Sequence, residues 1–289
     1  MKRKTSTEIE SIARLVGEEK AVEYVAKAGF DAWDFSMFSM CRWNWNANCP
    51  YNTTHILQTK EYLSFAKKLK NIGLDNGIIC NQSHAPFPSD APIMLDWIKR
   101  AIECSAEAGA EICVVHPANH YTPQENAEFY HKILPFAKEH KVKIATENMW
   151  DWDVEKNVAK FAACATPQDF NAVLDAVNDD YLVACLDIGH AEMMGETTNA
   201  VELIHALGKR LKALHIHDNN QWKDLHQIPF SEKIDFCSVA KALKKIGYEG
   251  YFTLESDSYL RNYSQDDVFA GVKKLAESVD RFNDLFESI

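Results

Sequence analysis

The sequence predicts an α/β protein folded as a closed (β/α)8 barrel, and two observations support this prediction. Short continuous apolar runs recur along the chain, as in parallel sheets buried on both faces, and segments with helical apolar spacing lie between most of them. Six runs also end at, or just before, a residue that can bind a metal ion: IICNQSH, EICVVH, VKIATE, LVACLD, LKALHIH and YFTLE. Because the C-terminal ends of barrel strands meet at one mouth, these residues are expected to surround one pocket.

The first strand is the weakest expected element. It can come only from residues 2–9, KRKTSTEI, which are short and polar, so it is expected to be atypical or absent. The other strands are expected at residues 30–37, 74–80, 110–116, 142–147, 181–187, 211–217 and 250–255. Helices are expected at residues 18–29, 60–73, 91–109, 126–140, 167–177, 200–208, 235–247 and 266–286. Several of these end in Gly, the common residue just after a helix.

Length and composition indicate one soluble domain over residues 1–289. No linker or low-complexity segment divides the chain, and no apolar stretch is long enough for a membrane span. The formal net charge of −11 argues against nucleic acid as a partner and favours a small, neutral or weakly charged substrate. The eight cysteines are scattered without C-x-x-C pairs, which indicates a reducing cytoplasm.

Two glutamates are the strongest candidates for catalysis. Glu147 and Glu255 end the expected fifth and eighth strands. From opposite sides of a barrel mouth they can share one divalent cation and face a substrate from two directions. Proton abstraction next to a carbonyl needs this combination of cation and base. The alternative, strand-end glutamates that reach solvent, is the weaker interpretation because both residues follow buried runs.

Histidines and aspartates supply further candidate ligands. In D-I-G-H, Asp187 finishes a strand and His190 turns back over the mouth. In LHIHDN, His215 and His217 face the same way, because side chains alternate along a strand, so spacing alone does not choose between them. Further candidates are His84 and His116, each followed closely by Pro at a strand end, and Asp224 and His226 on a loop. A lone histidine is more often a core residue, but the matching strand-end positions of His84 and His116 favour a functional one.

Two long segments carry four of the seven tryptophans. Residues 37–55 hold Trp43 and Trp45, and residues 147–167 hold Trp150 and Trp152. Loops after barrel strands build the substrate pocket, where exposed Trp suits stacking on the apolar face of a sugar. The alternative is that these rings only pack the loops down.

The motifs TENMW, CLDIGHAEMMG, LHIHDNNQWKDLH and FTLESD are similar to those of the xylose isomerase-like TIM barrel superfamily, and the resemblance runs from GFDAWDFS to TLES. The superfamily holds sugar isomerases and epimerases together with apurinic endonucleases of the endonuclease IV type. In the sugar branch, the resemblance implies one divalent metal, often manganese, held by Glu147, Asp187, His215 and Glu255. LHIHDN resembles the form x-H-x-K-D, which implies His215 as the ligand; the form G-H-x-H implies His217 instead.

In the endonuclease branch, the resemblance implies three zinc ions on nine ligands: His84, His116, Glu147, Asp187, His190, His215, Asp224, His226 and Glu255. The chain also departs from both branches. PFSEK replaces the usual G-E-G turn, the segment H-T-G-E-x-x-R is absent, and no Arg occurs between Arg210 and Arg261. The family's arginine contact to the end of the substrate is therefore in doubt.

Together these features predict a cytoplasmic, divalent-metal-dependent isomerase or epimerase of carbohydrate metabolism. Glu147 and Glu255 are the predicted catalytic residues, and substrate binding is assigned to His84, His116, His190, His217 and Trp150. The expected cofactor is one manganese ion; zinc, cobalt and magnesium are alternatives, and up to three ions are allowed. A lyase or hydrolase acting on a keto-sugar is the second interpretation, and a trinuclear-zinc endonuclease is the third. The expected partner is a small sugar, with no nucleic acid or membrane; a homo-oligomer is left open.

Overall fold

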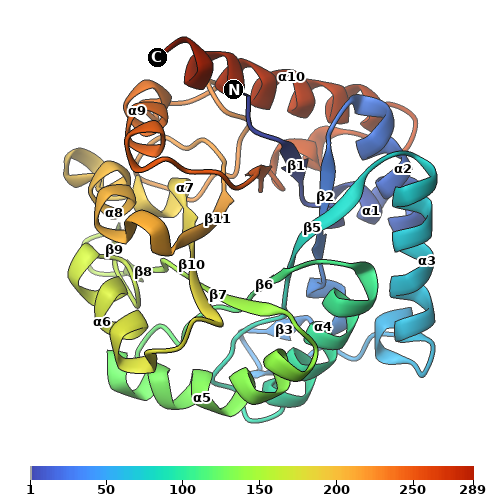
Figure 1. The fold of residues 1–289 in the computed structure, drawn as a ribbon, viewed down its shortest axis with the longest axis horizontal. Helices are drawn as coiled ribbons and strands as arrows, with labels where there is room; N and C mark the ends of the chain where they lie inside the picture. The colour runs from blue at the N-terminus through green and yellow to red at the C-terminus, as the bar shows by residue number, and fades with distance from the viewer. Residues whose placement is uncertain (1) are drawn as a thin grey trace.

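In the computed structural model, which describes residues 2–289, two parallel sheets join into a closed barrel surrounded by helices (Figure 1). The larger sheet has six strands in the order β11-β10-β7-β6-β5-β2, and the smaller pairs β1 with β12. Single bridges from Glu8 to Asp34 and from Ile216 to Leu254 join the sheets at both seams. The predicted α/β barrel is therefore confirmed.

The barrel strands are β1 (Thr5–Thr7), β2 (Ala32–Ser36), β5 (Ile79–His84), β6 (Ile112–Val114), β7 (Lys143–Glu147), β10 (Leu182–Asp187), β11 (Leu211–His215) and β12 (Phe252–Leu254). The first strand is present but only three residues long. It is polar yet fully buried, because its polar groups find partners: Asp31 accepts from the backbone of Thr5, and Ser6 donates to Asn81.

The major helices are α1 (Glu10–Val16), α2 (Glu18–Ala28), α3 (Tyr62–Asp75), α4 (Met94–Ala108), α5 (Pro123–Glu139), α6 (Pro167–Val177), α8 (Ala200–Leu207), α9 (Phe236–Ile246) and α10 (Val268–Ser288). The one-turn helix α7 (Ile188–Ala191) follows β10 directly. Short 3-10 turns occupy Phe38–Met40, Ile56–Gln58, Gly195–Thr197, Gly208–Arg210 and Tyr259–Asn262. No described helix is long and apolar enough to cross a membrane.

The predicted strand at residues 74–80 began too early, because Gly73 does not end the preceding helix. A Cβ on Gly73 would lie 2.9 Å from Nε1 of Trp33, so this glycine provides close packing of α3 on the barrel. Helix α3 ends at Asp75, Gly77 then turns the chain with a φ of +81° that favours glycine, and β5 begins at Ile79. The strand consequently ends at His84, inside the mouth.

Both tryptophan-rich segments form antiparallel hairpins above the mouth. The first pairs β3 (Trp43–Asn44) with β4 (Cys49–Pro50), and the second pairs β8 (Trp150–Asp153) with β9 (Val158–Phe161) (Figure 1). The hairpins are insertions between a barrel strand and the helix that follows it.

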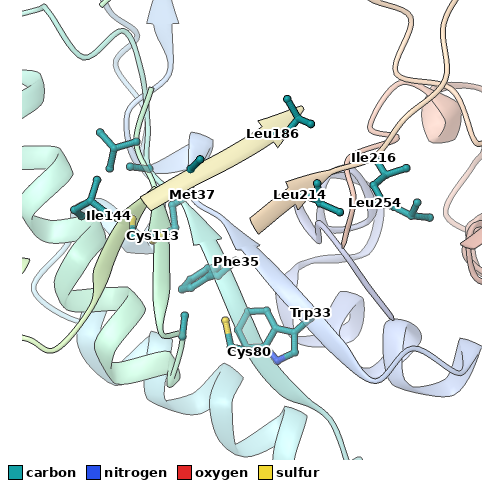
Figure 2. Packing of buried hydrophobic residues seen from close by; sticks show 14 of the residues in the cluster. Trp33, Phe35, Met37, Cys80, Cys113, Ile144, Leu186, Leu214, Ile216 and Leu254 are labelled. Carbon is teal, nitrogen blue, oxygen red and sulfur yellow. The ribbon is translucent and has the colours of Figure 1, made fainter. Parts of the chain in front are cut away.

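Strand alternation separates a large apolar layer, which lies between barrel and helices, from a barrel interior that holds both a small apolar cluster and charged groups. The small cluster consists of Val114, Ala145, Val183, Cys185 and Ala213. On β2, Trp33 and Phe35 belong to the large hydrophobic cluster between barrel and helices, which also contains Cys80 (Figure 2). Asp34, between them, is buried and accepts a hydrogen bond from Gln82 on β5 at 2.8 Å. The interior therefore contains charged groups close to the strand ends.

Candidate metal centre

The candidate ligands are placed by the ends of the barrel strands. Glu147, Asp187 and His215 are the last residues of β7, β10 and β11, and Glu255 follows β12 directly. All four are buried: Glu147 and Asp187 are 0% exposed, His215 is 1% exposed and Glu255 is 7% exposed. Burying three carboxylates at one point is costly unless positive charge compensates them.

We call Glu147, Asp187, His215 and Glu255 the central cluster, because their ligand atoms all lie within 4.8 Å of one another. Nδ1 of His215 is 3.0 Å from Oε1 of Glu147 and 3.3 Å from Oε2 of Glu255. Oε2 of Glu147 and Oδ2 of Asp187 are buried without a hydrogen-bond partner. A set of oxygen and nitrogen donors with unpartnered oxygens fits a divalent cation.

The His84–His116 cluster, made of His84, His116 and Glu147, adjoins the central one. The two Nε2 atoms are 2.9 Å apart, and they lie 3.5 and 3.2 Å from Oε2 of Glu147. Nδ1 of His84 is 2.8 Å from the carbonyl oxygen of Ala85, and donation there leaves Nε2 free as a ligand. Burial lowers the pKa of His116 to about 4, so its ring is neutral at pH 7 and offers a lone pair.

The His217 cluster lies on the other side of Asp187 and contains His190, His217, Asp224 and His226. Oδ2 of Asp224 is 3.0 Å from Nε2 of His226 and 3.5 Å from Nε2 of His190. His217 is 0% exposed, and neither of its ring nitrogens has a hydrogen-bond partner, although Nε2 is 3.0 Å from Oδ1 of Asp187. These unpartnered nitrogens indicate a second place where a cation fits.

Local structure explains the D-I-G-H motif. Asp187 caps the one-turn helix α7 by accepting from the backbone N–H of His190 at 2.7 Å, which turns that ring back over the mouth. The side-chain amide of Asn148 accepts a hydrogen bond from the backbone N–H of Asp187 at 2.8 Å and donates one to the backbone carbonyl of Asp187 at 2.9 Å. A Cβ on Gly189 would lie 1.9 Å from the His217 ring, so only glycine leaves room for this histidine.

In this site, neighbouring carboxylates raise the pKa of a histidine, and neighbouring histidines lower the pKa of carboxylates. Burial opposes protonation of His190, but Asp187 and Asp224 raise its pKa to about 10. Burial likewise opposes ionisation of Asp187, but His190 and His217 lower its pKa to about 2. The pKa of Glu147 lies well below its usual range, since His215 and its neighbours outweigh the effect of burial. Without metal, the site therefore holds protons on histidine that a cation would displace.

Asp34 is a site residue that the sequence analysis missed. Its Oδ2 lies 3.7 Å from Nε2 of His215, a buried nitrogen with no hydrogen-bond partner. Gln82 donates a hydrogen bond to the same carboxylate oxygen, at 2.8 Å. A carboxylate behind a ligand histidine orients the ring and raises its basicity. The detectable signal was the alternation in AWDFS, which turns Asp34 away from the apolar residues on either side.

Asp34→Asn is expected to weaken metal binding by about 10- to 100-fold, because the carboxylate behind His215 loses its charge. Competition with a fluorescent chelator measures the affinity without any need for turnover. Asp218→Asn is the matched control: Asp218 accepts from the backbone N–H groups of Asn219, Glu232 and Ile234 and orders a loop instead. Equal affinities of wild type and Asp34→Asn would contradict this role.

The structure brings together every histidine, aspartate and glutamate that the sequence nominated as a ligand. His215 and His217 both point into the mouth, but they belong to different clusters. Each cluster contributes residues to the lining of a cavity of about 850 Å³: His84, His116, His190, Asp224, His226 and Glu255. Trp43, Trp45, Trp150 and Trp152 also line it.

Comparisons with known proteins agree with this fold. An uncharacterized protein of Methanocaldococcus jannaschii, MJ1311, is 26% identical over 256 residues, which cover 82% of this chain and 78% of that protein. A solved D-tagatose 3-epimerase-like protein has a TM-score of 0.70 at 23% identity, covering 98% of this chain and 99% of its own. The 3-keto-D-glucoside 4-epimerase YcjR from E. coli has a TM-score of 0.67 at 15% identity, covering 96% and 99%.

At these identities the solved structures establish a shared fold. The family model described as a xylose isomerase-like TIM barrel matches residues 22–284, which is most of the sequence. The chain therefore belongs to the xylose isomerase-like TIM barrel family.

Proposed function

We propose that this protein is a divalent-metal-dependent isomerase or epimerase of a sugar. The observation that carries the proposal is the central cluster: two buried glutamates converge with Asp187 and His215, and one of them, Glu255, lines a cavity with aromatic walls. The fold shared with proteins named as sugar epimerases supports the same choice. We also propose a cytoplasmic location, in keeping with eight free cysteines.

The two glutamates differ in acidity, as an exchange of protons on two faces of a substrate requires. Histidines hold the pKa of Glu147 well below its usual range, whereas burial and the charge of Glu147 raise the pKa of Glu255. Glu147 therefore removes the proton next to the carbonyl, and Glu255 returns one from the other side. A bound cation would stabilise the enediolate oxygens.

The donor sets suggest which ions the clusters prefer. The central cluster has three carboxylates and one histidine, which suits manganese or magnesium, and we propose manganese there. The His217 cluster has three histidines and one carboxylate, which suits zinc. One ion in the central cluster is the minimum for the proposed chemistry, and the two adjoining clusters provide for up to three.

Exchange of substrate hydrogen with solvent tests the proposal. Metal-loaded protein is incubated in D₂O with a panel of ketoses and keto-glycosides, and NMR follows deuterium entry next to the carbonyl together with product identity. Exchange with epimer or isomer formation is expected. Exchange followed by loss of a substituent would identify a lyase instead, and no exchange with any member would reject proton transfer of this kind.

The second candidate is a trinuclear-zinc endonuclease, favoured by one specific observation: all nine of its expected ligands meet in the three clusters. The net charge of −11 and the tryptophans that line the cavity count against it. We therefore expect no specific nicking of a duplex with an abasic site after zinc or manganese loading. Nicking that disappears in Glu255→Gln would overturn the sugar assignment.

His215→Ala and His217→Ala should differ in which ion they lose. Nδ1 of His215 faces the central cluster, so His215→Ala should remove the ion needed for turnover. His217 faces Asp224 and Asp187, so His217→Ala should keep the central ion and lose one beside it. Metal analysis of both purified variants measures this difference. Loss of the central ion in His217→Ala alone would reverse the assignment.

A further inference from the structure

Two rows of aromatic side chains lead from the metal centre to the rim of the cavity. The first begins at His116, whose ring stacks on Phe87 with centroids 4.8 Å apart, and continues to Trp45 at 6.4 Å from Phe87. The second begins at His190 and continues through Trp150 to Trp152, in two steps of 6.4 Å. Each row therefore has an inner end at a candidate ligand and an outer end on a hairpin.

The cavity is larger than one monosaccharide requires. A hexose has about twelve non-hydrogen atoms, and even at the roughly 30 Å³ that each water molecule occupies in the liquid they fill only about 360 Å³. The cavity measures about 850 Å³, so a hexose at the metal centre leaves more than half of it free. Trp45, at the outer end of the first row, is 66% exposed. An aromatic ring in the wall of a cavity offers a flat apolar surface to a ligand.

Polar groups without partners lie beside the first row. Ser89 lines the cavity and is only 6% exposed, yet its hydroxyl has no hydrogen-bond partner. Nε1 of Trp43, also a lining residue, is buried and unpartnered. Arg42 lines the same wall and uses one guanidinium nitrogen on Glu10 and Ser39. Unpaired buried donors favour a ligand that carries hydroxyl groups.

We propose that Trp43, Trp45 and Ser89 form an outer subsite for a second sugar ring, so that the substrate is a glycoside or a disaccharide. This inference rests on the proposed function, because it takes the first ring to lie at the metal centre. An aromatic face suits the C–H face of a sugar, and the neighbouring donors suit its hydroxyls. A purely apolar substituent would leave the hydroxyl of Ser89 and the indole N–H of Trp43 unpaired, which argues against it.

Calorimetry with metal-loaded protein tests the outer subsite. D-fructose is compared with isomaltulose and turanose, in which the same ketose carries a glucosyl group. At least one disaccharide should bind about tenfold more tightly than the free ketose. Trp45→Ala should remove this gain and leave the affinity for fructose unchanged. Trp222→Ala is the matched control, since Trp222 is 48% exposed but lies outside the cavity lining, and it should keep the gain.

Three outcomes would overturn the subsite: equal affinities for fructose and both disaccharides, an equal loss for all ligands in Trp45→Ala, or no binding by any of them. The measurement is independent of turnover. Tighter disaccharide binding without deuterium exchange would therefore support the outer subsite while rejecting the proposed proton transfer. Deuterium exchange without tighter disaccharide binding would support the proposed proton transfer and reject the outer subsite.

Discussion

Glu147→Gln is expected to abolish turnover while the barrel stays folded. Glu147 belongs to both the central and the His84–His116 clusters, with Oε1 toward His215 and Oε2 toward His84 and His116. Glutamine keeps the volume but removes the charge that would hold a cation and the carboxylate proposed as the base. Both losses act on the same step, so deuterium exchange should fall by at least about 1,000-fold.

Glu128→Gln is the matched control for this prediction, because Glu128 is an exposed acid on α5, far in the chain from any ligand. It should retain full activity, and circular dichroism should show the same fold for both variants. Turnover of Glu147→Gln within tenfold of wild type would show that another group is the base.

Removal of the metal is expected to have the second-largest effect, on stability. The described site buries Glu147, Asp187 and Glu255 within one cluster, and protonated histidines compensate part of their charge when no cation is present. With free metal at about 1,000 times its dissociation constant, binding adds about 4 kcal/mol to the free energy of unfolding. For a chain of this size we expect chelation to lower the thermal midpoint by about 10 °C. An unchanged midpoint would contradict a metal in this site.

The stability of the metal-free protein and its affinity for metal are both expected to depend on pH. The pKa of His190 is raised from 6.5 to about 10 in the folded protein, so its contribution to stability is complete below 6.5 and is lost as pH rises toward 10. Metal-free protein should therefore weaken between neutral and alkaline pH. Metal competes with these protons, so its affinity should rise over the same interval. Metal titrations at pH 6, 7 and 8 measure this trend.

The sequence was sufficient to bring the candidate ligands of the central cluster together with His84 and His116, because these residues end or follow buried runs and a barrel brings such positions to one mouth. It could not reveal that Asp34 lies beside His215, because β2 and β11 are not neighbouring strands and the two side chains meet inside the barrel. Nor could it divide His215 and His217 between clusters: alternation correctly turned both inward, but their partners come from distant strands. The start of β5 was wrong because Gly73 serves packing against Trp33, a contact that no local pattern encodes.

The hairpins contribute tryptophans to the cavity wall, whereas the strand ends carry the central cluster. The central cluster stands at the ends of barrel strands, whereas Trp45 and Trp152 are on insertions between a strand and its helix. The tips of the hairpins can change the cavity wall, provided that Asn148, just before β8, keeps its hydrogen bonds to the backbone of Asp187. Proteins that descend from such a scaffold can thus acquire new substrates by changes in two short segments while they keep the same chemistry. For the same reason, hairpins can be exchanged between relatives to change the substrate of an engineered variant.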